Sequence, residues 1–117
     1  MKTIIAGPRD CMVPREKIAE AVGQSGFEVT EVFCGCSTGV DEAGAEWAAF
    51  HNVPVMYFPV AWDTHGSRAG PMRNARMVKE AEALIAIQYA GRETRGTADV
   101  IRRAKKKGVP VYVMEVS

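Results

Sequence analysis

The chain has 117 residues and a formal net charge of +1, from 15 basic and 14 acidic side chains. This length fits one domain, residues 1–117, with a single hydrophobic core. The balance of charge argues against a nucleic-acid clamp, which needs a basic excess on one face, but suits a small anionic ligand. No apolar stretch approaches about 18 residues, so no membrane span is predicted. The first predicted strand begins too early to leave room for a signal peptide.

The cysteines indicate a reducing compartment. Cys11, Cys34 and Cys36 are odd in number and two of them form a C-x-C pair, which is not the pattern of a disulfide framework. We therefore expect free thiols and a cytoplasmic protein. His51 and His65 are the only histidines, so we predict neither a metal site nor a bound cofactor.

The first half of the chain alternates between strand and helix patterns. Residues 3–6 are a short apolar strand that ends at Gly7-Pro8. Pro14 opens a helix with apolar residues at helical spacing. Residues 29–33 form a second strand, and residues 40–50 form a second helix with acidic residues in its first turns, where the dipole favours them.

The second half continues the alternation. Residues 53–58 are the third strand, and residues 59–70 are the longest irregular stretch, typical of a lid or binding loop. Pro71 starts a helix that runs to about residue 82, and residues 83–87 are the fourth strand. The last helix spans residues 97–107, with Thr97 able to cap it. Residues 109–113 are the fifth strand.

Five strands alternating with four helices predict an α/β, Rossmann-like, doubly wound parallel sheet in the order 3-2-1-4-5. Right-handed crossovers bring the C-terminal ends of all strands to one rim, where such folds bind ligands. The switch point then lies between strands one and four, so residues 91–97 face residues 7–9 across the crevice.

Two rim segments have the composition of an anion cradle. Residues 91–97 form a turn between a strand and a helix, which aims backbone N–H groups at an anion, and Arg95 adds a charge beside Gly96 and Thr97. The loop from Cys34 to Gly39 resembles it: Gly35 and Gly39 allow close approach, and Ser37 and Thr38 offer hydroxyl groups. The need to reverse the chain in a short loop and to cap the following helix explains these residues equally well.

Four further side chains are ligand candidates. Arg73 and Asn74 fall in the first turn of the helix that is predicted to start at Pro71. A cation opposes the helix dipole there, so a ligand or a carboxylate on another segment must account for Arg73. Asn74 either contacts the ligand or braces the loop. Trp62 either stacks on a base or plugs the core edge. Arg9 follows strand one and is an anion ligand or a solvated charge.

No Ser/His/Asp or Cys/His arrangement can be assembled. The carboxylates near the rim are Asp41, Asp63, Glu93 and Asp99, each with a structural interpretation as cap, dipole partner or surface charge. Lys105, Lys106 and Lys107 close the last helix, where the dipole favours cations. We interpret them as solvated charges and not as a nucleic-acid patch.

The combined motifs resemble the SLOG superfamily, in particular its small branch related to YspA and the plant-type YpsA proteins, over nearly the whole chain. The motifs are Gly7-x-Arg9, Gly35-x-x-x-Gly39-x-Asp41, Ala45-Glu46-Trp47-Ala48, Phe58-Pro59-x-x-Trp62, Ala69-Gly70-Pro71-x-Arg73-Asn74 and Arg95-Gly96-Thr97.

This resemblance implies a Rossmann-like fold whose glycine-rich and Gly-Thr loops hold a nucleotide or nucleotide-derived ligand, and a homo-oligomer, dimeric or larger. Relatives include LOG-type phosphoribohydrolases, which cleave the N-glycosidic bond of nucleoside monophosphates, and nucleotide-sensing domains. The LOG pattern Pro-Gly-Gly-x-Gly-Thr-x-x-Glu places its glutamate at Val100 of this chain. Asp99 lies about 100° away around the helix. Hydrolysis by that mechanism is therefore not expected, whereas phosphate binding is.

Three functional hypotheses follow. The first is a sensor or sequestering protein that binds a nucleotide-derived molecule at the rim. The second is an N-glycosidase or base-transferring enzyme that uses Asp41 or Asp99. The third is a protein-interaction module, such as a phage or mobile-element accessory protein, with a vestigial rim.

Overall fold

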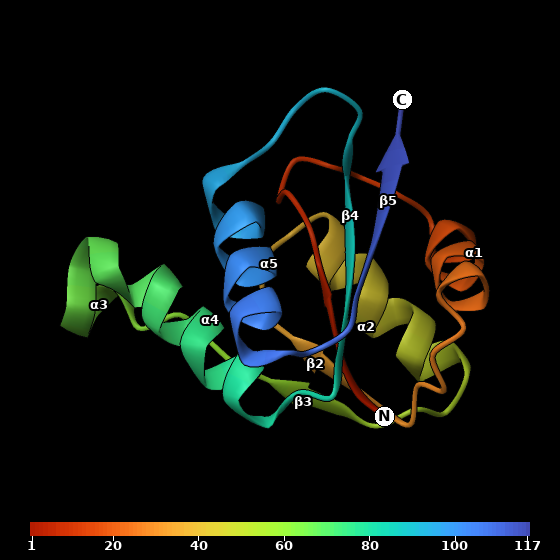
Figure 1. Cartoon of the computed structure of the whole chain (residues 1–117), viewed down its shortest axis with the longest axis horizontal. Coiled ribbons are helices and arrows are strands. Elements are labelled where there is room, and N and C mark those ends of the chain that lie inside the picture. Colours follow the sequence, from red (N-terminus) through yellow and green to blue (C-terminus); the bar gives the residue numbers. More distant parts are fainter.

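A computed structural model describes all 117 residues of the chain. Its centre is one parallel sheet in the order β3-β2-β1-β4-β5 (Figure 1), as predicted. The strands are β1 (Lys2–Ala6), β2 (Glu31–Cys34), β3 (Val55–Tyr57), β4 (Ala83–Tyr89) and β5 (Val111–Val116). The fold is therefore a single-domain, doubly wound α/β sheet.

Two helices cover each face of the sheet. The pair α1 (Arg15–Ser25) and α2 (Val40–Phe50) packs on one face, and the pair α4 (Ala69–Glu80) and α5 (Arg95–Lys107) packs on the other (Figure 1). Right-handed crossovers produce this division, because the chain winds outward from β1 in one direction and then returns past β1 to β4 in the other. No helix has the length and apolar character needed to cross a bilayer.

The two helical layers create two hydrophobic cores that share the sheet. Neighbouring residues of β1 point in opposite directions, so Ile5 belongs to the core under α1 and α2 with Trp47, whereas Ile4 belongs to the core under α4 and α5 with Met77 and Val100. All five residues of β4 from Ala83 to Ile87 are buried. Burial on both faces explains why this strand is continuously apolar.

The segment of residues 59–70 differs from the predicted irregular loop. It contains the short helix α3 (Trp62–His65) and the 3₁₀ turn Gly66–Arg68, which lead directly into α4. Since α4 begins at Ala69, Pro71 is its third residue, where the missing N–H has no intrahelical partner to lose. Figure 1 shows α3 projecting from the body of the molecule.

Two helix starts also differ from prediction. Because α4 begins earlier, Arg73 and Asn74 lie in its second turn and not in its first. Because α5 begins at Arg95, the capping position belongs to Thr94, which has an extended backbone. Thr97 is buried inside the first turn, with its hydroxyl 3.1 Å from the hydroxyl of Thr94. Thr97 is therefore a packing residue and does not cap the helix.

Candidate functional site

A hydrogen bond joins the first two rim loops. The hydroxyl of Thr38, in the loop after β2, donates to the backbone oxygen of Arg9, in the loop after β1, at 2.8 Å. Gly39 lies beneath this contact with a φ of 73°, and a Cβ on it would lie 2.6 Å from the carbonyl oxygen of Pro8. The two loops therefore pack as one unit at the switch point.

Asn74 joins the other two rim segments. This buried amide donates to the carbonyl oxygen of Gly96 at 3.3 Å and to the carboxylate of Asp99 at 3.0 Å, and accepts a bond from Nε of Arg73 at 2.8 Å. It fastens the N-terminal half of α4 to the first turn of α5. The structure therefore supports its interpretation as a brace.

Arg73 connects α4 to the loop after β2. Its guanidinium donates to the carbonyl oxygen of Gly35, and the carboxylate of Asp41 flanks the same glycine. A Cβ on Gly35 would collide with the Arg73 guanidinium and lie 2.7 Å from Oδ2 of Asp41. The carbonyl oxygen of Gly35 is therefore the direct partner of this arginine, and the charge of Asp41 favours the guanidinium without forming an ion pair with it.

Asp41 is buried at the start of α2, with 4% of its surface exposed. Burial raises the pKa of Asp41 to about 6, although the Arg73 guanidinium and the N–H groups of Ser37 and Gly7 favour the charged form. The N–H of Ser37 donates to Oδ2 at 3.3 Å, whereas Oδ1 has no hydrogen-bond partner. Burial thus brings the pKa of this carboxyl group closer to neutrality than that of an exposed aspartate.

Asp99, the second candidate acid, is held as a charged carboxylate. Its carboxylate pairs with Arg102 at 2.6 Å and with Arg103 at 2.9 Å. Burial alone would raise the pKa of Asp99, but hydrogen bonds from Asn74 and Arg103 outweigh it and leave the pKa below its ordinary value. A carboxylate fixed as an anion by two arginines is a poor proton donor.

The rim glycines fall into two groups. Gly7 is packed so closely that a Cβ would overlap the carbonyl oxygen of Ile87 and the side chain of Val40, and Gly35 and Gly39 are similarly enclosed. Gly96 differs: a Cβ there would meet no atom within 4 Å. The fold therefore requires Gly7, Gly35 and Gly39, whereas it gives no steric reason for glycine at position 96.

No side chain caps the N-terminus of α2 or of α5. The first-turn N–H groups of both helices are thus free of side-chain caps, and the helix dipoles add partial positive charge there. Arg9 and Arg95 are exposed beside these ends. The rim therefore combines two helix N-termini with two exposed cations.

Trp62 does not join this group. It lies on the projecting helix α3 with 57% of its surface exposed, and its ring approaches the position that a Cβ on Gly70 would occupy. The segment of residues 61–68 is exposed throughout. The structure thus places Trp62 outside the core, on the segment that follows β3, and its contact with a base stays a prediction.

Cys34 and Cys36 have different environments. Burial raises the pKa of the Cys34 thiol to about 11, and its sulfur lies 3.5 Å from the backbone oxygen of Asp41. Cys36 is exposed, with a φ of 67°. No group of three or more histidine, cysteine or acidic side chains is arranged to hold a metal ion.

Sequence reasoning missed the contacts that span the switch point itself. Arg92 pairs with Asp10 at 2.7 Å, and the hydroxyl of Tyr89 donates to the backbone oxygen of Asp10 at 3.3 Å. These contacts confirm that the loops after β1 and β4 face each other. Opposite charges in the two predicted rim loops, Asp10 and Arg92, were the available signal.

The fold and the rim define the class of this protein: a small, Rossmann-like α/β domain whose loops converge at the C-terminal ends of the strands. No protein-family model matches the chain. The chain is similar to the "Gene 61 protein" of Mycobacterium phage D29, with 28% identity over 119 residues that cover 94% of this chain and 93% of that protein. The resemblance to the SLOG superfamily stays a prediction.

Proposed function

We propose that this protein binds a nucleotide or nucleotide-derived anion at the rim, with its phosphate over the first turn of α5. The observation that carries the proposal is Gly96. It occupies the second position of a helix, where glycine is a poor helix former by about 1 kcal/mol relative to alanine, and no protein atom excludes a side chain. A ligand that approaches the backbone closely explains the missing side chain.

The surrounding charges support this proposal. The uncapped N-termini of α2 and α5 offer backbone N–H groups to an anion. Arg9 and Arg95 are exposed cations from the two loops that face each other at the switch point. Arg73 donates to the carbonyl oxygen of Gly35 and so helps to hold the loop after β2 in place.

Titration calorimetry tests the proposal with a panel of nucleoside monophosphates and triphosphates, ADP-ribose and cyclic nucleotides. We expect at least one to bind. Gly96→Ala should weaken binding by about tenfold or more, which corresponds to about 1.4 kcal/mol, because its methyl group occupies the approach to the N–H groups. Arg95→Ala should weaken binding as well.

Gly23→Ala is the matched control. Gly23 also lies in a helix with no atom near the added Cβ, but it is on α1, away from the rim loops. Both alanine variants should be at least as stable as the parent, so a loss of binding in Gly96→Ala alone cannot come from unfolding. Equal affinity in both variants, or no binding to any member of the panel, contradicts the proposal.

The enzyme hypothesis is favoured by one observation, the buried carboxyl of Asp41 with its raised pKa and unpartnered Oδ1. A group that titrates near pH 6 can transfer protons at neutral pH. Release of free base from nucleoside monophosphates, abolished by Asp41→Asn while nucleotide affinity is kept, would support turnover. Binding without release at every pH supports the sensor hypothesis.

We also propose that the chain self-associates through its apolar edge. Met56 and Tyr57, on the three-residue edge strand β3, and Trp62 and Met72, on the projecting segment, are between 42% and 59% exposed. An uncovered edge strand with exposed apolar side chains is prone to pair with another chain. A second copy of this protein would cover both features.

A further inference from the structure

The fold separates charges that are balanced over the whole chain. Helices α4 and α5 pack side by side and carry nine basic and two acidic residues. Helices α1 and α2, on the opposite face of the sheet, carry two basic and five acidic residues. The net charge of +1 therefore conceals one strongly basic face.

Most cations of this face lack an acidic partner. Asp99 pairs with Arg102 and Arg103, and Arg73 is turned inward to the carbonyl oxygen of Gly35. None of the remaining six forms an ion pair; they are Arg76, Lys79, Arg95, Lys105, Lys106 and Lys107.

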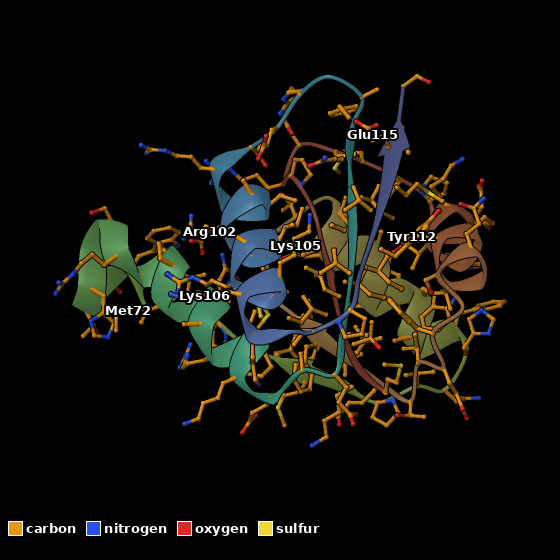
Figure 2. The ribbon with its side chains drawn as sticks, viewed as in Figure 1. Met72, Arg102, Lys105, Lys106, Tyr112 and Glu115 are labelled. Carbon is orange, nitrogen blue, oxygen red and sulfur yellow. The ribbon has the colours of Figure 1, made fainter.

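A groove of about 320 Å³ runs between the C-terminal halves of the two helices. Its floor is formed by Ala75 and Val78, and its walls carry Lys79, Arg103, Lys106 and Lys107. The ammonium group of Lys107 donates to the backbone oxygen of Val78 at 2.9 Å, which holds this charge in place. Figure 2 shows Lys106 on the side of α5 that faces α4.

Helix dipoles explain only part of this arrangement. A cation in the last turn of one helix is favourable, and Lys79 and the three lysines of α5 occupy such turns. Packing both basic ends side by side, however, brings like charges together, and this repulsion lowers stability. A bound polyanion would convert the repulsion into attraction.

We propose that this α4–α5 groove binds the phosphodiester backbone of a nucleic-acid duplex. The groove carries four cations, Lys79 on α4 and Arg103, Lys106 and Lys107 on α5. The helix rises about 6 Å from Arg103 to Lys107, and successive phosphates of one strand are about 3.4 Å apart along a duplex. Four cations over this length fit a chain of phosphates better than a single phosphate group.

The chemistry of the groove also selects the mode of binding. Its floor is aliphatic, with no aromatic side chain on which an unpaired base could stack. Its polar groups are lysines and an arginine, which contact phosphates and position a protein on a duplex without reading its sequence. Binding should therefore depend on charge and salt and be independent of base sequence.

Fluorescence anisotropy with a labelled duplex DNA of mixed sequence tests this proposal. We expect a dissociation constant of roughly 10⁻⁴ to 10⁻⁶ M, as for other sequence-independent contacts. Four phosphate contacts predict a slope of about −3 to −4 in a plot of log affinity against log salt concentration. A duplex of different sequence should bind equally well.

Lys79→Gln and Lys106→Gln should each weaken binding and reduce the salt slope by about one. Lys17→Gln is the matched control, because it removes the same charge from α1 on the acidic side of the molecule. All three positions lie on the helix surface, so folding is preserved. Gly96→Ala should leave duplex binding unchanged, which keeps this test independent of the rim.

Three results would overturn the proposal. The first is no duplex binding at low salt, and the second is an equal loss in the Lys17→Gln control. The third is competition by poly-glutamate as effective as competition by unlabelled duplex, which would assign the face to an acidic protein.

Discussion

Gly7 shows how closely the segments at the rim pack against one another. A single methyl group at this position would overlap the Ile87 carbonyl oxygen on β4 and the Val40 side chain at the start of α2. Both neighbours belong to the packed interior, where backbone and side chains have little room to move. The glycine is thus needed for β1, β4 and α2 to meet.

We expect Gly7→Ala to lower the free energy of unfolding by about 1–3 kcal/mol or more, as for other overpacked positions. Urea denaturation measures this change. Gly23→Ala, where the added Cβ meets no atom, should leave stability unchanged or raise it by about 0.5–1 kcal/mol. Equal stability of the two variants would show that the rim can open to admit a methyl group.

Asp41 predicts a pH dependence of stability. Its pKa is about 6 in the folded protein, above the value of about 3.9 in an unfolded chain, so the folded state binds this proton more tightly. Its contribution to stability is fully present below about pH 4 and is lost as the pH rises through about 6. The loss amounts to about 3 kcal/mol.

Asp41→Asn removes this titration. Urea denaturation from pH 4 to pH 8 should show the variant gaining stability relative to the parent as the pH rises, by up to about 3 kcal/mol. Comparing the two proteins at each pH cancels the opposite contribution of Asp99, whose lowered pKa makes it favour stability at higher pH. Parallel pH profiles would contradict a raised pKa at Asp41.

At the scale of elements, the pairing of α4 with α5 depends on Asn74. Two of its three hydrogen bonds reach α5, at Gly96 and Asp99, and the third joins it to Arg73 of α4. Its burial leaves no water to replace a lost partner, so the bonds contribute more than exposed ones.

We expect Asn74→Ala to cost about 1–3 kcal/mol, because it leaves Arg73 and the Gly96 carbonyl with fewer partners. A double-mutant cycle with Asp99→Ala, measured by urea denaturation, should give a coupling energy of about 0.5–3 kcal/mol. Simple additivity of the two losses would show that the Asn74–Asp99 contact carries no energy.

The accuracy of the predicted elements follows the strength of their apolar patterns. The central strands and the helices α1, α2 and α5 bury one or both faces, so their residues alternate at recognisable spacings. The segment of residues 61–68 buries nothing, and an exposed helical turn leaves no such pattern. Thr94 and Thr97 are chemically equal as caps, and only burial of the second distinguishes them.

For some site residues, the sequence predicted the kind of contact that the side chain makes but not the residue that it contacts. The position of Arg73 near the start of a helix indicated that an anionic or polar group must face it. Its partners at Gly35 and Asp41 lie more than thirty residues earlier in the chain, and only the packing of α4 against the β2 loop brings them together. The raised pKa of Asp41 follows from that same burial.

At the scale of the whole molecule, the apolar edge predicts assembly. We expect the weight-average mass in sedimentation experiments to rise with protein concentration, and Trp62→Ser and Tyr57→Ser to shift the protein toward the monomer, because both remove exposed apolar surface. Trp62 emission should move to shorter wavelength on assembly. A monomer at every concentration would contradict self-association.

The order of apolar segments along the chain was sufficient to establish its fold class, and its composition was sufficient to establish its total charge. Alternating apolar segments require a parallel sheet covered on both faces, and a count of side chains yields +1. The distribution of that charge depended on the winding of the chain. Right-handed crossovers on the two sides of β1 place α1 and α2 on one face and α4 and α5 on the other. The same crossovers bury Asp41 and leave Gly96 open, because burial depends on neighbours that are distant in the sequence.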